Sequence, residues 1–142
     1  MIKRCSNSAL IYAVIAMVFG VFYREFTKFN GFEGDTRLSV IHTHYFILGM
    51  MFFLILMLIE KSIGFSSEKH AGKIIFTYHI GLNITGAAFF ARGLTQALQS
   101  ELSKGADASI SGVAGIGHVI MGVSIILLLL KIKKSASSGD KK

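Results

Sequence analysis

The sequence predicts an all-α integral membrane protein, folded as one four-helix antiparallel bundle. Hydrophobic residues make up 52% of the 142-residue chain, a share too high for a soluble domain unless they lie in membrane-length blocks. They do lie in such blocks: the chain has four apolar runs, each near the roughly 20 residues that a helix needs to cross a bilayer. Short polar segments separate the runs, so successive helices should be antiparallel neighbours.

We expect a single domain over residues 1–134 and a flexible basic tail over residues 135–142. The spans are expected at about residues 8–28, 37–60, 74–98 and 110–130. The first run follows Lys3 and Arg4, and a short basic start before an apolar run is also the form of a cleaved signal peptide. No A-x-A cleavage site follows it, so a first transmembrane helix is the better interpretation.

The basic residues indicate how the chain crosses the membrane. Ten lysines and arginines lie in the two terminal segments and in the connection between the second and third spans, against five on the other side. Because lysine and arginine are enriched in cytoplasmic loops, we expect a protein of the bacterial inner membrane with both termini in the cytoplasm. The net charge of +7 is then a topology signal, and the expected partner is the lipid bilayer and no nucleic acid.

Four histidines lie within the predicted spans, where an unpaired imidazole is unfavourable and marks a functional site. His42 and His44 point to nearly opposite sides of a regular helix, so one metal ion is not expected to bind both. His44 and His118 lie at similar depths, about 10 and 13 Å from the outer boundary. His79 lies in the other half of the bilayer. We therefore expect an outer histidine cluster and a separate inner histidine.

Glycines share a helix face with three of these histidines: Gly115 and Gly122 with His118, Gly49 with His42, and Gly86 with His79. Small residues of this kind are typical of tight helix packing in membranes. They would equally leave room for a flat macrocycle beside an axial imidazole.

His44 differs, because its face of a regular helix continues with large apolar residues (Leu48, Met51, Ile55 and Leu58). An imidazole on such a face would meet lipid unless another subunit covers it, so we expect a homo-oligomer with His44 near a subunit boundary. On the third span, Arg92 either extends to the outer surface or holds a carboxylate, for example a haem propionate.

The segments VIHTHYFILGMM, YHIGLNITG, ARG and GIGHVIMG resemble a family of small bacterial four-span membrane proteins of unknown function. More distantly, His42-Thr43-His44 resembles the His-x-His pair in the central subunit of haem–copper oxidases and nitric oxide reductases. That pair sends its two imidazoles to two haems, so the resemblance implies haem. The copper ligands of those enzymes have no match here, and this chain has four spans where they have twelve, so it does not imply oxygen reduction.

We therefore expect b-type haem, with axial ligands from His42 or His44 and from His118, an optional second site at His79, and a contact to Arg92. Such a protein would transfer electrons, sense redox state or bind a gas; whether it is an enzyme, and its redox partner, are open. Copper is the first alternative, because imidazole and methionine suit it. The second is a cofactor-free scaffold or accessory subunit with structural histidines. The single cysteine, Cys5, excludes an internal disulfide and a cysteine-based metal site.

Overall fold

The computed structural model describes residues 1–139, and every regular element among them is helical. The elements are α1 (Ile2–Phe29), α2 (Leu38–His44), the π-helix η1 (Tyr45–Met51), α3 (Phe52–Ile63), the 3-10 helix η2 (Phe65–Ser67), α4 (Ala71–Ala97) and α5 (Lys104–Gly139). Because α2, η1 and α3 continue one another as a single span, residues 1–139 contain four helices long and apolar enough to cross a membrane. The predicted all-α, four-helix membrane fold is confirmed.

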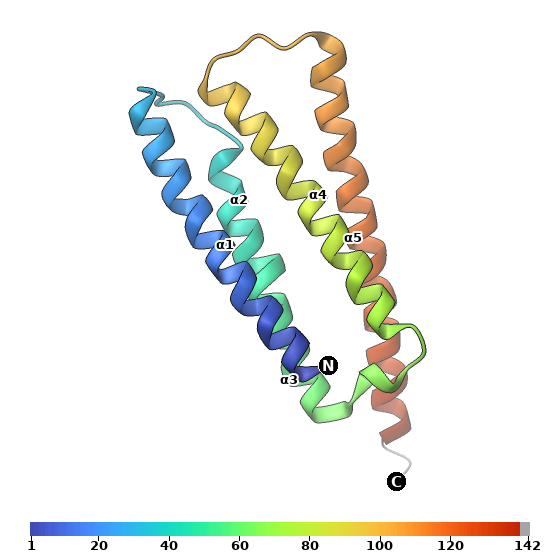
Figure 1. Cartoon of the computed structure of the whole chain (residues 1–142). Helices are drawn as coiled ribbons and strands as arrows, with labels where there is room; N and C mark the ends of the chain where they lie inside the picture. The colour runs from blue at the N-terminus through green and yellow to red at the C-terminus, as the bar shows by residue number, and fades with distance from the viewer. Residues whose placement is uncertain (140–142) are drawn as a thin grey trace.

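The bundle consists of two antiparallel helix pairs (Figure 1). One pair is α1 with the span formed by α2, η1 and α3; the other is α4 with α5, and the pairs meet along α2 and α4. Both described chain ends and the α3–α4 connection lie at one end of the bundle, here called the termini end; the α1–α2 and α4–α5 connections lie at the loop end. Large apolar side chains such as Leu10 and Val119 are exposed on the outer faces, as expected of helices that face lipid.

All four spans extend beyond their expected bounds at one end or both, α1 and α5 by the most residues. α1 begins at Ile2, and α5 runs from Lys104 to Gly139, so the boundary expected between residues 134 and 135 lies inside a helix. The hydroxyl of Ser135 donates to the carbonyl oxygen of Ile63 at 3.0 Å, which ties this part of α5 to the end of α3. Residues 135–139 of the expected flexible tail are thus helical, and residues 140–142 lie outside the described part of the chain. Hydropathy marks the apolar centre of a span, whereas polar residues can extend the helix beyond it.

Close packing of α4 on α5 depends on glycine. A Cβ atom at Gly117 would lie 2.9 Å from the backbone nitrogen of Thr85, and one at Gly81 would lie 2.7 Å from the backbone nitrogen of Met121. Only glycine lets two helix backbones approach this closely, which is the usual packing of membrane helices through small residues. Because His118 follows Gly117, this contact sets where His118 stands relative to α4.

The second span contains the π-helix η1, which begins directly after His44. The hydroxyl of the fully buried Tyr78 donates a 2.6 Å hydrogen bond to the carbonyl oxygen of Leu48 within it. At Gly49 the backbone lies so close to α1 that a Cβ atom would be 2.6 Å from Cβ of Tyr12. A side chain that binds a helix carbonyl is a known cause of such local departures from α-helical geometry. An apolar run of this kind is compatible with an α-helix and with a π-helix, so the sequence does not predict η1.

Candidate functional site

His44 of α2 and His118 of α5 lie side by side next to α4. Their ring centroids are 6.1 Å apart and their ring planes are perpendicular. Phe89 of α4 lies against both, with centroid distances of 4.9 Å to His44 and 5.7 Å to His118. Three helices therefore build one group of rings, here called the His44–Phe89–His118 cluster, from two histidines that the sequence places at similar depths.

The two ring nitrogens of His118 have different surroundings. Nδ1 lies 2.8 Å from the carbonyl oxygen of Ala114, one turn earlier in α5. A carbonyl oxygen can only accept, so Nδ1 carries the proton and Nε2 of the neutral ring keeps a free lone pair. Metal-binding histidines commonly have their second nitrogen bonded to a backbone carbonyl in this way. His118 is exposed in the isolated chain, so its ring is accessible to a ligand.

A cavity of about 510 Å³ adjoins the cluster on the side of the loop end. Phe89 and Ala114 line it, together with Arg92, Asp107 and Ser111. A small-molecule site typically has a volume of about 300–1,000 Å³ and a few polar groups on a mainly apolar wall. The cavity has a volume in this range, but more than half of its lining residues are polar or charged.

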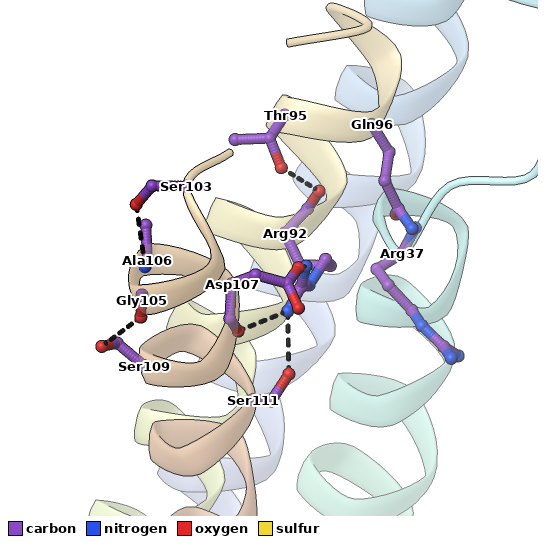
Figure 2. Close-up of polar contacts among 10 residues, drawn as sticks. All are labelled: Arg37, Arg92, Thr95, Gln96, Ser103, Gly105, Ala106, Asp107, Ser109 and Ser111. Carbon is purple, nitrogen blue, oxygen red and sulfur yellow. Dashed lines mark hydrogen bonds and ion pairs between the residues drawn. The ribbon is translucent and has the colours of Figure 1, made fainter. Parts of the chain in front are cut away.

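Arg92 is bound to the first turns of α5 (Figure 2). Its Nη1 forms an ion pair with Asp107, and its Nη2 donates to the carbonyl oxygen of Asp107 and to Oγ of Ser111, each at 2.8 Å. Of the two sequence-based alternatives for Arg92, a contact to a carboxylate is the one found, and the carboxylate belongs to this chain. Since a guanidinium has five N–H donors, some remain for a second anion. The Arg37 side chain extends away from Arg92, and the Arg37 backbone N–H donates to Oε1 of Gln96 at 2.8 Å.

His42 faces α1 and takes no part in the cluster. A Cβ atom at Gly20 of α1 would lie 3.7 Å from Cβ of His42. Nδ1 of His42 is buried and has no hydrogen-bond partner among the described residues. The divergence of His42 and His44, which the sequence predicts from the helical angle, is therefore found in the structure. His44 has its ring contacts within its own chain, so a subunit boundary is not needed to cover it.

His79 belongs to a separate polar network between α1 and α4, toward the termini end. Its Nδ1 lies 2.6 Å from the hydroxyl oxygen of Tyr12, and its Nε2 lies 3.5 Å from Oγ of Ser8. Nδ2 of Asn83 donates to the Tyr12 hydroxyl at 3.0 Å and to the His79 carbonyl at 2.8 Å, and Oδ1 of Asn83 accepts from the Tyr45 hydroxyl at 3.3 Å. Ser8, Tyr12 and Tyr45 were not predicted from the sequence as partners of His79, although a buried tyrosine hydroxyl usually has a hydrogen-bond partner.

The interpretation that glycines leave room for a macrocycle is wrong at two of the histidines. The ring of Tyr12 fills the space beside Gly49, and the ring of Tyr45 fills the space beside Gly86. At Gly115 and Gly122 no atom lies within 4 Å of an added Cβ, so the space beside them is open and the interpretation stays a prediction there. Of the four glycines that share a helix face with these histidines, only the two beside His118 have open space next to them.

The described residues include no group of three or more histidine, cysteine, aspartate or glutamate side chains that could hold a metal ion. The His44–His118 pair offers two imidazoles, which is enough for the axial positions of haem iron or for a two-coordinate ion, but not for a closed tetrahedral site.

No curated protein and no solved structure matches this chain, so the His-x-His resemblance to haem–copper oxidases gains no support. One family model does match, over residues 2–135, and it is described as "Protein of unknown function (DUF2871)". The match includes all of the first three spans and nearly all of α5. The protein therefore belongs to the DUF2871 family.

Proposed function

We propose that this membrane protein holds a redox metal between His44 and His118, in the first place as the iron of b-type haem. The separation of the two rings carries the proposal. An imidazole nitrogen binds a metal at about 2 Å, so two imidazoles on opposite sides of one metal have centroids about 6 Å apart. The observed 6.1 Å equals that spacing, and perpendicular ring planes are compatible with it.

The surroundings of His44 and His118 support haem. The 510 Å³ cavity has Arg92 in its wall, and Arg92 has donors left that suit a propionate. The space beside Gly115 is open for a macrocycle edge. Since both axial positions would be filled by histidine, the expected function is electron transfer or redox sensing and not gas binding.

The position of Phe89 favours a second form, a copper ion without a macrocycle. Its ring is nearly equidistant from His44 and His118, so it lies in the plane that a macrocycle ligated by both would fill. Haem therefore requires Phe89 to rotate away, whereas a bare ion does not. Imidazole is a suitable ligand for copper.

The location proposed for this site is the outer half of the bacterial inner membrane, with both termini in the cytoplasm. The support comes from the basic residues at the termini end, such as Lys3, Arg4 and Lys61, against fewer at the loop end. The His44–Phe89–His118 cluster lies toward the loop end.

Absorption spectra of the purified protein, expressed with a haem precursor, test the proposal together with copper and iron analysis. We expect a Soret band that is lost or strongly shifted in His44→Ala and in His118→Ala. His42→Ala is the matched control: it removes an imidazole two residues from His44 that faces α1, and its spectrum should be unchanged. Phe89→Ala separates the two forms, because it makes room for haem and should keep or raise haem content, while it should not change the content of a bare ion.

One other outcome would contradict the haem form alone, and another would contradict the whole proposal. A colourless protein with about one copper ion per chain, lost in both His44→Ala and His118→Ala, would replace haem by copper. A protein free of haem and metal, or a Soret band unaffected by both substitutions, would mean that the two histidines are structural and that the scaffold reading is correct.

A further inference from the structure

A second cavity, of about 340 Å³, lies at the termini end of the bundle between the first turns of α1 and α4. Its wall includes Ser8 and His79, the rings of Phe53 and Phe76, and Arg4. Phe76 is 66% exposed on the outer surface of α4, so the cavity adjoins the lipid-facing side of the bundle. It belongs to the other half of the molecule from the His44–Phe89–His118 cluster and shares no residue with the cavity there.

The hydrogen bonds around His79 fix which of its nitrogens carries the proton. Nδ2 of Asn83 donates to the His79 carbonyl oxygen, which can only accept, so the orientation of the Asn83 amide is determined. The same Nδ2 donates to the Tyr12 hydroxyl oxygen. The Tyr12 proton is then left for the other contact of that hydroxyl, Nδ1 of His79 at 2.6 Å. Nδ1 accepts, and in the neutral ring the proton is on Nε2.

This N–H group is available to a ligand. Nε2 of His79 lies 3.5 Å from Oγ of Ser8, which is longer than the 2.7–3.2 Å usual for N–H···O hydrogen bonds, so Ser8 satisfies it poorly. The ring itself is held firmly, since it stacks on Phe53 with a centroid distance of 4.5 Å and nearly parallel planes. The cavity therefore presents an oriented N–H donor and a hydroxyl on a wall that also includes the exposed ring of Phe76.

We infer that this cavity binds the head group of a membrane quinone, with one carbonyl oxygen accepting a hydrogen bond from Nε2 of His79 and from the Ser8 hydroxyl. A quinone has the three properties that the site requires: a carbonyl acceptor, a flat ring that can pack on the exposed ring of Phe76, and solubility in the bilayer from which the cavity is reached. The volume is at the lower end of the range for ligand sites and suits a one- or two-ring head group, with any tail left in lipid. The inference does not depend on the metal proposed at His44 and His118.

The test measures binding of menadione, a two-ring quinone without a long tail, to the full-length protein in phosphatidylcholine nanodiscs. The comparison ligand is 2-methylnaphthalene, which has the same rings and methyl group but no carbonyl. We expect saturable menadione binding and at least about tenfold weaker binding of 2-methylnaphthalene, since the part-buried donors of His79 and Ser8 would lose their acceptor. Equal affinities would overturn the inference, because apolar partition would then explain both.

Variants locate the site. Ser8→Ala and His79→Phe should weaken menadione binding severalfold to tenfold or more, and His79→Phe keeps a ring against Phe53. The matched control is Ser39→Ala, which removes a serine hydroxyl at the loop end. That hydroxyl donates to the carbonyl oxygen of Thr36, just before α2. Thermal stability is measured for each variant; Ser8→Ala is the milder one and keeps the test valid if His79→Phe fails to fold. The inference is wrong if menadione affinity is unchanged both in Ser8→Ala and in any folded His79 variant. It is also wrong if phosphatidylglycerol displaces menadione, because the cavity would then bind a lipid head group.

Discussion

Replacing Gly117 with alanine should separate α4 from α5, while the same change at Gly115, two residues away in the same helix, should not. A methyl group at Gly117 would lie 2.9 Å from the backbone nitrogen of Thr85 and 3.0 Å from the carbonyl oxygen of Gly81. These are backbone atoms of a helix and cannot rotate aside, so the two helices must move apart. At Gly115 nothing lies within 4 Å of the added atom.

The expected magnitude follows from two opposing effects. Overpacking of a close contact lowers the free energy of unfolding by about 1–3 kcal/mol. Alanine in place of glycine inside a helix raises it by about 0.5–1 kcal/mol. Both variants gain the second effect and only Gly117→Ala has the first, so their free energies of unfolding should differ by about 1–3 kcal/mol. For a chain of this length that is a gap in Tm of roughly 3–15 °C.

The single cysteine provides the assay. Cys5 is 2% exposed, so a dye that fluoresces on reaction with thiols reports unfolding in detergent. Gly117→Ala should have the lower Tm of the two variants. Equal Tm values, or a higher value for Gly117→Ala, would refute the close approach of α4 and α5. If the metal proposal is also correct, Gly117→Ala should shift the Soret band, because the neighbouring His118 moves relative to His44.

Two further predictions concern topology and assembly. A fluorescent protein fused after the C-terminal segment should fluoresce in the cytoplasm, and alkaline phosphatase fused after Leu98 should be active outside; the reverse pattern would overturn the assignment from basic residues. The homo-oligomer expected from the sequence would have to form through a surface that can equally face lipid, such as the one with Met51, Ile55 and Leu58, which are 46%, 52% and 58% exposed. Mass measurement in nanodiscs checks this expectation, and a strict monomer would contradict it.

The number and approximate positions of the spans were predictable because a bilayer requires about 20 apolar residues per helix, and such runs are visible in the sequence. The helix ends were not, since they depend on tertiary contacts. In α5, the hydroxyl of Ser135 reaches Ile63, and Lys134 pairs with Glu68 at 2.8 Å, so the helix continues through residues that hydropathy assigns to a tail.

For the histidines, the sequence was informative about direction and depth but not about partners. The helical angle separates His42 from His44 correctly because α2 is regular up to His44. After His44 the regular helical angle no longer predicts the residues on its face, because the π-helix η1 begins there. Phe89 could not be singled out, because nothing in an apolar span distinguishes one phenylalanine from another before the helices pack.

The partners of His79 bear on where a metal could bind. Nδ1 of His79 accepts from Tyr12, and the neutral ring then has its proton on Nε2, so neither nitrogen offers a lone pair without loss of a hydrogen bond or of a proton. The sequence-based option of a second haem at His79 therefore has less support than the pair at His44 and His118. In His118 the bond to Ala114 has the opposite sense: Nδ1 donates, and the lone pair of Nε2 stays free for a metal. The free N–H donor of His79 is therefore the basis for proposing a quinone beside it, and the free lone pair of His118 is the basis for proposing a metal between His44 and His118.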